Sequence, residues 1–554
     1  MTRSFDLLER PWVLVSDDSG SVHQLSSLDV FRRAPEMSLI AGEIPTQAAA
    51  VLRLHLAIAH RALAPQRPRP LESAMEEWAT WWQAGTVPLE RIEAYLRAHQ
   101  DRFDLFDPVA PFMQVADLHT ATGSTSGLVK LIAEVPDGEK FFTTRAGSSI
   151  ERIDAAEAAR WLVHAQAYDP SGIKTGAVGD PRVKGGRGYP IGQGWTGRIG
   201  LVIVEGATLA ETLLLNLDLS TPSPTDDRPV WERAPVTAAP EGDDPDGGRP
   251  PRGVVDLLTW QVRRVRLLGE GEWVDDVVIA NGDRVTPQNQ QHREAATAYR
   301  YSDPQTKELG HDVYMPLEHP PEQALWRGLA PLLSESRASA GEKPARLRPP
   351  LLTWLAALRD SGDLPANHPV RLRAVGMQYG THAASIVGVT DDALALRAGI
   401  LTDPAARAEV VAAVDATHAA VGCLRTLAAN LVLAAGGDAD DGARSRAEEL
   451  AYGALHLPFV RWLAHLDLED LDAGGDRWHV AARAILRGLA AELIESAGPA
   501  ALRGRVVTPG RGAARLLDAG RAEIYFLSGL AKALDRGLPE VASDDDDDPQ
   551  ESTA

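Results

Sequence analysis

The chain has 554 residues, a formal net charge of −21 and 44% apolar residues. Its length exceeds what one hydrophobic core supports and indicates two or three domains. The single cysteine, Cys423, excludes an intrachain disulfide and a zinc site built from cysteines, and it is typical of a reducing cytoplasm.

The first residues lack the features of a signal peptide. Asp6 and Glu9 precede a very short apolar run, whereas a signal peptide has basic residues followed by an apolar segment. No apolar run approaches the roughly 20 residues that span a bilayer. We therefore expect a soluble, cytoplasmic protein that contacts no membrane.

The N-terminal part mixes strands and helices. The segment PWVLV at 11–15 reads as a strand, and IPTQAAAVLRLHLAIAHRAL at 44–63 reads as a buried helix with Thr46 as its N-cap. Helices are also expected at 71–82 and 89–98. Residues 128–143, 254–268 and 273–279 have patterns typical of strands, and 199–218 reads as a strand, a turn, and a second strand or a helix.

Residues 221–253 interrupt this pattern. They are rich in Pro, Gly and Asp with hardly any apolar periodicity, and 221–250 carries seven acids against three bases. Such a composition indicates a flexible acidic surface insertion or linker. Because strand-like sequence resumes after it, we expect the domain to continue across the insertion.

The C-terminal part is rich in Ala and Leu at helical spacing. Asp403-Pro404 supplies an N-cap with proline at the first helical position, and further helical segments follow at about 442–468, 475–497 and 510–536. Four long helices joined by short loops predict an antiparallel four-helix bundle at 389–538, after a large mixed domain at 1–388. The predicted class is α+β, and the run Asp544 to Asp548 indicates a disordered acidic tail at 539–554.

The stretch GIKTGAVGDPRVKGGRGYPIGQGWTGRIG, residues 172–200, holds ten glycines, five bases and one acid. Glycines let backbone N–H groups approach an anion and basic side chains neutralise it, so a phosphate ligand is indicated. The segment GQGWTG at 192–197 matches the residue pattern GxGxxG of the dinucleotide-binding fingerprint. A strand-like sequence follows it where that fingerprint needs a helix, and this context argues against a dinucleotide site.

Searches for metal ligands and nucleophiles find little. His311-Asp312 has no spaced partners and is typical of a surface turn, and His418 and His456 fall on predicted bundle helices. Neither a nucleophile elbow nor a zinc-binding HExxH helix occurs. The sequence thus indicates no metal, no cofactor and no catalytic residue.

Three other loops carry polar or aromatic groups. GEKFFTTRAG at 138–147 sets Phe141 and Phe142 between Lys140 and Arg145, a pattern that suits stacking on nucleobases or a strand end in the core. YRYSDPQTKELG at 299–310 offers Lys307 on an exposed turn. VGMQYGTHAASI at 375–386 sets Gln378, Thr381 and His382 around a glycine, where such polar groups serve either a turn or a ligand contact.

Taken in order, FDLLERPWVLV, AGEIPTQAAAVLRLHLAIAHRAL, GEKFFTTRAG, GIKTGAVGD, GDRVTPQNQQHREAATAYR and the C-terminal helices resemble the CasA family, the large subunit of the type I-E CRISPR Cascade surveillance complex. The resemblance covers most of the chain. It implies a non-catalytic subunit that reads a protospacer-adjacent motif in duplex DNA, assists strand opening and R-loop formation, and recruits a helicase-nuclease for antiviral defence. Its implied partners are other Cascade subunits, guide CRISPR RNA and target DNA.

The resemblance also assigns roles to residues. The family's glycine loop corresponds to Lys174, Thr175, Gly176, Ala177, Val178 and Gly179, its lysine finger to Lys307, and its aromatic loop at the guide's 5′ end to Lys140, Phe141, Phe142 and Arg145. The duplex wedge departs from the family pattern, because His382 stands where a glutamine is expected and Gln378 lies earlier. Gln378, Thr381 and His382 therefore all stay candidates.

Two other functions compete with this one. A stand-alone enzyme would bind a nucleotide or phosphorylated substrate through the glycine-rich loop and would purify without RNA. A pure scaffold would tolerate substitutions in that loop without loss of DNA binding. The resemblance favours the DNA-reading subunit.

Overall fold

The computed structural model describes residues 3–135, 143, 145, 148–241, 248–320, 323–333, 343–438, 441–508 and 514–537. The chain divides into two compact units, Met1–Pro404 and Ala405–Ala554. The division falls later than the expected boundary at residue 388, because strand β17 (Ile386–Arg397) runs through that position and pairs with β16 (Pro369–Tyr379). The predicted acidic tail at 539–554 lies outside the described residues.

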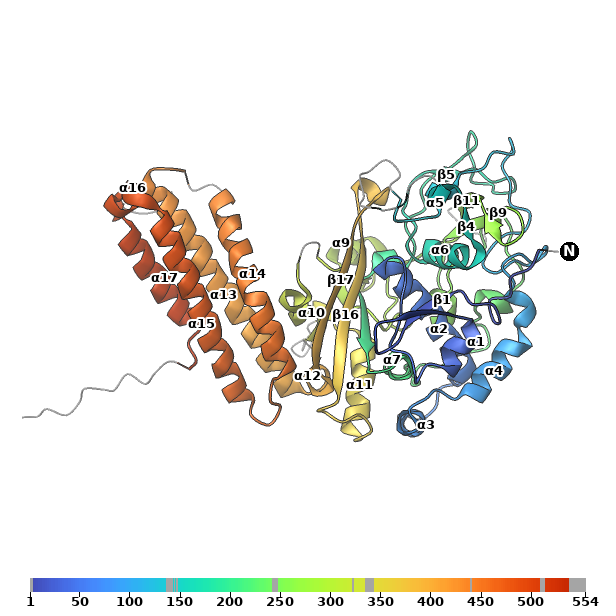
Figure 1. The fold of residues 1–554 in the computed structure, drawn as a ribbon, viewed down its shortest axis with the longest axis horizontal. Coiled ribbons are helices and arrows are strands. Elements are labelled where there is room, and N and C mark those ends of the chain that lie inside the picture. The colour runs from blue at the N-terminus through green and yellow to red at the C-terminus, as the bar shows by residue number, and fades with distance from the viewer. Residues whose placement is uncertain are drawn as a thin grey trace, which may run out of the picture. The chain divides into compact units, whose positions relative to one another are not determined.

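Unit 1 is a mixed α+β structure with small sheets (Figure 1). Its N-terminal sheet has the order β2-β1-β3, formed by β1 (Val13–Ser16), β2 (Val22–Leu25) and β3 (Leu39–Ile40). The predicted buried helix is α2 (Pro45–Leu63). Its N-cap is Ile44 and not Thr46, because Pro45 occupies the first helical turn, where a missing N–H costs nothing. Thr46 is buried inside the helix, with its hydroxyl 3.0 Å from His164 Nε2.

The longest sheet pairing in unit 1 is a hairpin of β16 and β17, with β7 (Leu201–Glu205) on the other side of β16. A second antiparallel pair joins β9 (Arg263–Leu268) to β11 (Asp276–Asn281). Smaller sheets are formed by β4 (Ile153–Asp154) with β10 (Trp273–Val274), β8 (Gly248–Arg249) with β12 (Arg284–Val285), and β13 (Tyr299–Tyr301) with β14 (Tyr314–Pro316) and β15 (Arg346–Leu347).

The helices of unit 1 other than α2 are mostly short. They are α1 (Ser27–Arg32), α3 (Leu71–Ala84), α4 (Leu89–Ala98), α5 (Ser148–Glu151), α6 (Ala155–Tyr168), α7 (Leu209–Leu215), α8 (Val254–Leu258), α9 (Asp303–Leu309), α10 (Leu329–Leu333), α11 (Pro350–Asp360) and α12 (Ala398–Thr402). The predicted helices at 71–82 and 89–98 are confirmed as α3 and α4. The strand expected at 128–143 is wrong for its described part, which holds a 3-10 turn at Leu128–Lys130.

The predicted flexible insertion at 221–253 is instead packed against unit 1 over its described residues, 221–241 and 248–253. Asp227 and Trp231 are buried, and Asp227 accepts hydrogen bonds from the backbone N–H groups of Val255 and Asp256 at 3.2 and 2.9 Å. The segment has little regular structure because its prolines remove backbone donors, yet side-chain hydrogen bonds hold it in place. These described residues are therefore packed against unit 1, as a fully solvated linker would not be.

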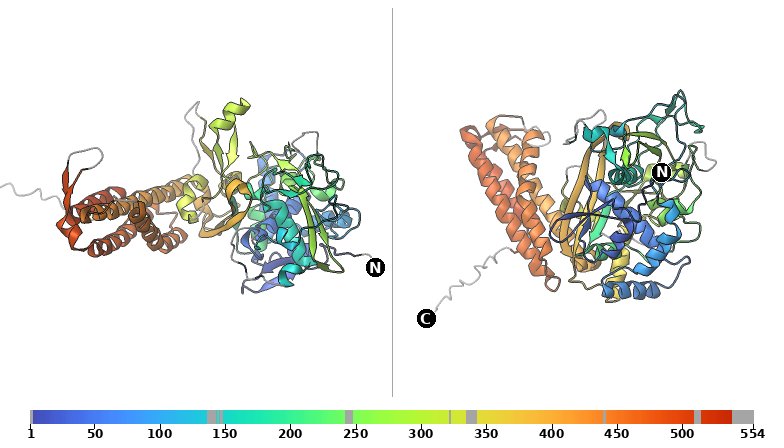
Figure 2. Two further views of the ribbon diagram at one scale, coloured as in Figure 1. Left: turned by 90° about the horizontal axis from the view of Figure 1, so that it is seen from above. Right: turned by 45° about the vertical axis from the view of Figure 1, so that its right-hand side comes forward.

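Unit 2 contains four long helices that lie side by side (Figures 1 and 2). They are α13 (Pro404–Ala435), α14 (Asp441–Ala464), α15 (Leu471–Ser496) and α17 (Ala519–Ala533), with α16 (Gly498–Arg503) and the hairpin β18 (Arg505–Val507) and β19 (Arg515–Leu517) between the last two. Trp478 on α15 is buried, stacks edge-on against Phe459 of α14, and donates to Thr417 of α13 at 2.9 Å. The core thus joins three helices.

Among the described helices, α13 alone is long and apolar enough to cross a membrane by length and composition. This finding differs from the expectation that no such run exists. Val414, Val421 and Leu424 of α13 are buried in unit 2, so part of its apolar surface is used as a core.

Candidate nucleic-acid interface

The glycine-dense stretch folds as a compact hairpin followed by a tight turn. Strand β5 (Lys174–Thr175) pairs antiparallel with β6 (Arg187–Gly188), and a 3-10 turn follows at Thr196–Arg198. Gly176 is buried, and a Cβ atom there would lie 2.6 Å from the carbonyl group of Gly186. At Gly194 a Cβ would lie 2.2 Å from the carbonyl oxygen of Ala167. These glycines are required because the chain packs closely on itself.

The outer surface of this hairpin is partly apolar and partly cationic. Ile173, Val178 and Tyr189 expose 57%, 46% and 53% of their surfaces. Lys184 and Arg187 are exposed, and neither side chain has a hydrogen-bond or ion-pair partner within the described part of the chain. We call the exposed residues 173, 178–179, 184–187 and 189 the hairpin face. It offers a backbone rich in glycine, two unpaired cations and three apolar side chains.

Lys174 does not belong to this exposed surface. Its ammonium group lies 2.5 Å from Asp169 Oδ2, which also accepts a 2.5 Å hydrogen bond from Arg263 Nε. Burial lowers the pKa of Lys174, while Asp169 opposes that shift. Burial would raise the pKa of Asp169, but the Lys174 and Arg263 cations outweigh it and hold this pKa below its usual value. The charge of Lys174 is therefore balanced by Asp169 inside the fold.

The remaining residues of the predicted glycine loop divide between core and surface. Thr175 Oγ1 lies 3.2 Å from Ser126 Oγ, and Ala177 is buried and bridged to Thr120. Val178 and Gly179 are exposed, and Gly179 has a φ of +95°, a conformation that favours glycine. The loop is therefore anchored at 174–177 and presents 178–179 to solvent.

The insertion supports this loop from behind. Ala238 of the insertion packs in one apolar cluster with Ala177 of the loop and with Val278 and Ala280 of β11. Asn281 at the end of β11 donates to the carbonyl of Tyr189 at 2.6 Å. The hairpin face thus rests on β11 and on the segment predicted to be flexible.

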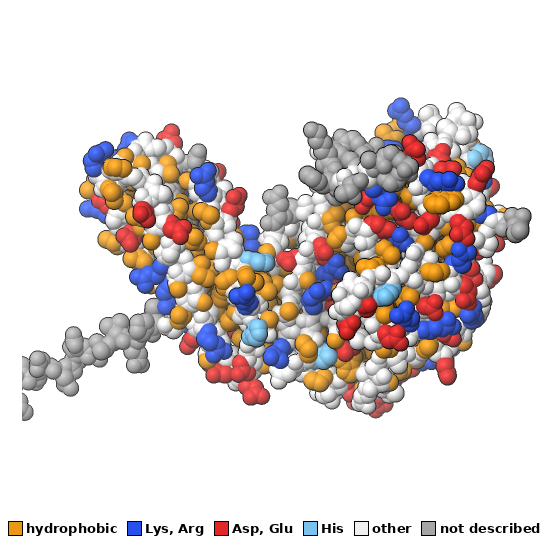
Figure 3. Space-filling view, viewed as in Figure 1, with side chains coloured by type: hydrophobic (Ala, Val, Ile, Leu, Met, Phe, Trp, Pro, Cys, Tyr) orange, Lys and Arg blue, Asp and Glu red, His pale blue; other side chains and the backbone are white. Residues whose placement is uncertain are grey.

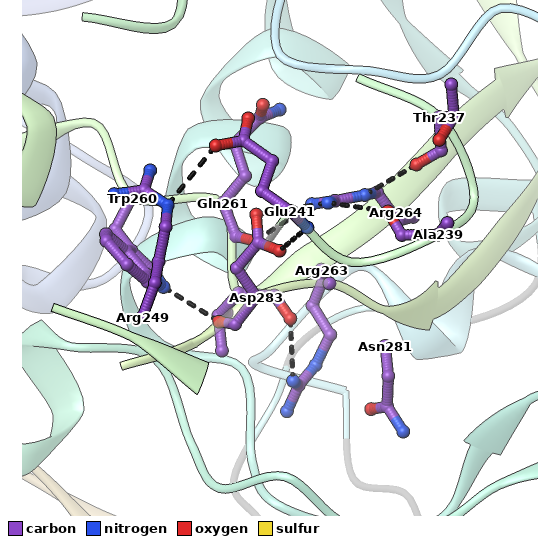
Figure 4. A network of polar contacts seen from close by, with 12 residues as sticks. Thr237, Ala239, Glu241, Arg249, Trp260, Gln261, Arg263, Arg264, Asn281 and Asp283 are labelled. Atoms are coloured by element: carbon purple, nitrogen blue, oxygen red, sulfur yellow. Dashed lines mark hydrogen bonds and ion pairs between the residues drawn. The ribbon is translucent and has the colours of Figure 1, made fainter. Parts of the chain in front are cut away.

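A polar network fixes the insertion to β9 and to Asp283, which follows β11 (Figure 4). Arg264 is fully buried, and it donates to the carbonyl of Thr237 at 2.7 Å and to Asp283 Oδ2 at 3.0 Å. Asp283 Oδ1 accepts the backbone N–H of Glu241 at 2.7 Å, and its carbonyl accepts Trp260 Nε1. The Asp283 carboxylate therefore balances the charge of buried Arg264 and also accepts a backbone hydrogen bond from the insertion.

The tip of the β16–β17 hairpin meets the start of the glycine-rich stretch. The backbone N–H of Ser171 donates to the carbonyl of Ala383 at 2.7 Å. Thr381 and His382 are exposed at the tip, and His382 and Ala383 have φ values of 57° and 52°. A left-handed conformation at two residues other than glycine is costly and marks a constrained turn.

Gln378 does not share the exposure of the tip. Its Nε2 donates to Thr390 Oγ1 across the hairpin at 3.2 Å. Of the three wedge candidates, Thr381 and His382 are therefore presented to solvent, whereas Gln378 joins the two strands.

The aromatic-loop residues Lys140, Phe141 and Phe142 lie outside the described residues. Arg145 is described, and it forms ion pairs with Glu134 and, at 2.6 Å, with Glu157. Its side chain is 13% exposed. Arg145 therefore holds the base of this loop against α6, and its charge is compensated within the fold.

Lys307 lies on α9, which connects the antiparallel strands β13 and β14 and projects from the rest of unit 1 (Figure 2). It is exposed, and no described residue pairs with it. Among the described residues, no hydrogen bond or ion pair joins α9 to the hairpin face.

The context of GQGWTG is that of a turn before a strand. Trp195 is buried and donates to Glu294 Oε2 at 2.7 Å, and the chain continues into β7, which confirms the predicted strand. A dinucleotide fingerprint needs a helix at that point, so the segment lacks the geometry of that site. Across the described residues, no three His, Cys, Asp or Glu side chains are grouped to hold a metal ion.

Lys184 and Arg187 are the residues that sequence reasoning missed. Both stand in the glycine-dense stretch, but only the fold separates them from the paired Lys174.

On the face of the molecule shown in Figure 3, acidic and basic side chains are interspersed. The net charge of −21 therefore does not describe the local surface.

Comparisons with known proteins give the family. A family model described as CRISPR-associated protein Cse1 matches residues 6–492. The CasA/Cse1 protein of Thermus thermophilus is 30% identical over 471 residues, which cover 83% of this chain and 85% of that protein. The chain belongs to the CasA/Cse1 family of CRISPR-associated proteins, as its resemblance indicated.

Solved structures agree with this assignment. The crystal structure of Thermobifida fusca Cse1 is 42% identical with a TM-score of 0.86, over 96% of this chain and 98% of that one. A chain in a structure described as a CRISPR RNA-guided surveillance complex has a TM-score of 0.67 at 20% identity, over 96% of this chain and 99% of that one. The latter likeness concerns the fold alone.

Proposed function

We propose that this chain is a non-catalytic, cytoplasmic subunit of a guide-RNA surveillance complex, and that its hairpin face reads a protospacer-adjacent motif in duplex DNA. The observation that carries this proposal is the combination of unpaired cations with exposed glycine backbone. Lys184 and Arg187 supply charge for phosphates, while the exposed Gly179, Gly185 and Gly186 have no side chain to block a minor groove about 6 Å wide. Other subunits and guide RNA then complete target recognition.

The hairpin tip at 381–383 supports a role in strand opening. It is exposed, constrained in a left-handed turn, and hydrogen-bonded to the residue that leads into the glycine loop. We assign the wedge to Thr381 and His382, because Gln378 is engaged by Thr390. Replacing His382 by glycine keeps the turn conformation and removes the side chain, so R-loop formation should slow while duplex binding persists. Equal rates of strand opening, followed by permanganate reactivity of unpaired thymines, would exclude His382.

Unit 2 completes the proposal. Its four long helices form an antiparallel four-helix bundle that serves as a docking surface for neighbouring subunits, and the assembled complex recruits a helicase-nuclease for antiviral defence. The support for these finer roles is family membership, since a related fold occurs in a surveillance complex.

The decisive experiment changes the charge of the hairpin face without disturbing its core. Val178 is 46% exposed, so Val178→Asp and Val178→Asn differ mainly in charge. In the assembled complex, Val178→Asp should weaken equilibrium binding of a motif-bearing duplex at least about tenfold, or about 1.4 kcal/mol, because a carboxylate repels phosphates. The affinity of the Val178→Asn complex for the same duplex should stay within about threefold of the parent affinity, because asparagine adds no charge. Equal affinities for the two variants would refute the assignment.

A further inference from the structure

A cavity of about 370 Å³ lies inside unit 1, away from the hairpin face. Its walls come from α2, β7, the segment 216–222, α8, the segment 291–296 and the start of α11. The lining is largely apolar and includes Leu52, Leu56, Ile203, Leu217, Leu258 and Leu351. Cavities of a few hundred Å³ with apolar walls and a few polar groups are the usual form of small-molecule sites.

One polar side chain in this cavity has no partner among the described residues. His60 lines the cavity, is 4% exposed, and neither of its ring nitrogens meets the geometry of a hydrogen bond with another described group. The backbone of Thr221 is close enough to affect its pKa but makes no such bond. A buried polar group without a partner is costly, so an unpaired imidazole facing a cavity indicates a missing ligand group.

The imidazole is uncharged at neutral pH. Burial lowers the pKa of His60 to about 4, and Asp218 opposes this shift only in part. A neutral imidazole offers one N–H donor and one nitrogen acceptor. The side-chain oxygen of Gln291, also in the lining, is a second buried acceptor without a partner among the described residues. The unpaired groups thus suit a ligand that both donates and accepts hydrogen bonds.

The charged groups of the walls are already balanced. Arg53 forms two hydrogen bonds, of 3.2 and 2.6 Å, with the two carboxylate oxygens of Glu294. Asp218 accepts from the Ser220 backbone and hydroxyl at 2.8 and 2.5 Å and from the Thr221 hydroxyl at 2.9 Å. Arg293 adds one positive charge to the lining against the one negative charge of Asp218. A charged ligand would upset this balance, whereas a neutral one would not.

We propose that this cavity binds a neutral, mainly apolar compound that carries a hydroxyl or carboxamide group, with His60 as the hydrogen-bonding partner of that group. The apolar walls hold the apolar part of the ligand, and the imidazole pairs with the polar substituent. This site uses no residue of the hairpin face, and its occupation does not depend on DNA.

Two probes of similar shape test the role of the polar group. We would titrate the full chain at pH 7 with 1-naphthol and with 1-methylnaphthalene, which lacks the hydroxyl, by calorimetry. The proposal expects saturable binding of 1-naphthol, with an affinity at least about fivefold higher than that of 1-methylnaphthalene, which corresponds to about 1 kcal/mol. Absence of saturable binding, or equal affinities for the two probes, would overturn it.

Three variants locate the site. His60→Phe keeps the ring shape and removes both nitrogens, so it should abolish the preference for 1-naphthol. The matched control is His55→Phe, because His55 is a buried histidine of the same helix that does not line the cavity, and it should retain the preference. Leu56→Trp should fill the cavity and weaken both probes at least about tenfold. Retention of the preference in His60→Phe, or parental affinities in a folded Leu56→Trp protein, would contradict the proposal.

Discussion

Lys174 and Lys184 stand ten residues apart in one cationic stretch, but the same substitution should affect a different property of the protein at each position. Lys174 is paired inside the Asp169–Arg263 triad, whereas Lys184 is exposed on the hairpin face. Methionine keeps much of the apolar length of a lysine and removes its charge. Lys174→Met should therefore reduce stability, and Lys184→Met should reduce DNA binding.

The magnitude follows from what remains around Asp169. Removing one partner of a buried ion pair costs about 3–5 kcal/mol when the other charge is left alone. Arg263 still donates to Asp169 at 2.5 Å after Lys174→Met, so the loss is one charge-assisted hydrogen bond, about 2 kcal/mol. Asp169→Asn leaves two buried cations together and belongs to the higher range, about 4 kcal/mol. Lys184→Met should cost less than about 0.5 kcal/mol.

Hydrogen exchange of peptides that cover 160–200 in the full chain measures the local free energy of opening and avoids a two-state assumption for both units. Binding of duplex by the assembled complex at several salt concentrations measures the number of phosphate contacts. Lys184→Met should lower the salt slope by about 1, and Lys174→Met should leave it unchanged. Unaltered exchange in Lys174→Met together with a lower salt slope would refute the assignment of the two lysines.

Three further substitutions or conditions test the structure around the site. Gly176→Ala places a Cβ 2.6 Å from the Gly186 carbonyl group and should open β5 and β6 to hydrogen exchange, whereas Gly185→Ala meets open space and carries only backbone strain of about 1 kcal/mol. Asp283→Asn removes the charge beside buried Arg264 and should lower the free energy of unfolding by about 3–5 kcal/mol. Proteolysis between residues 233 and 241 should become faster. An unchanged cleavage rate would show that the polar network does not hold the insertion in place. Burial lowers the pKa values of His55 and His60 to about 4 and of His164 to about 3, so the unfolded chain binds more protons below pH 6.5 and stability falls as the pH is lowered. Denaturation at pH 7 and 5 should differ by about 2 kcal/mol for each of these histidines, and a flat profile would contradict their burial as neutral rings.

Elements with strong local periodicity could be predicted from the sequence. The helix at 89–98 matches α4, and Asp403-Pro404 marks the start of α13, because capping and spacing act within a few residues. The strand expected at 128–143 failed in its described part, since a short apolar run does not specify its partner strand. The segment 254–268 begins as helix α8 and becomes β9 only at Arg263.

The order of the insertion could not be predicted from composition. Its Pro, Gly and Asp residues are typical of a linker, but Asp227 caps the start of α8 and Ala238 packs against Ala177. These contacts join residues that are far apart in the sequence, so local patterns carry no signal for them. The same applies to Lys174, whose burial depends on Asp169 and on Arg263 from a distant strand.

The five bases of the glycine-dense stretch limit the affinity that this stretch can supply. Lys174 is paired with Asp169, Arg182 with Asp180, and Arg198 is partly buried with a hydrogen bond to the Gln193 carbonyl. Only Lys184 and Arg187 remain to meet phosphates from this stretch. Two phosphate contacts give a slope of only about −2 in a plot of log binding constant against log salt concentration, which is much shallower than for tight DNA binders. Duplex binding through this stretch alone should therefore be weak, so tight binding requires cations that lie outside it.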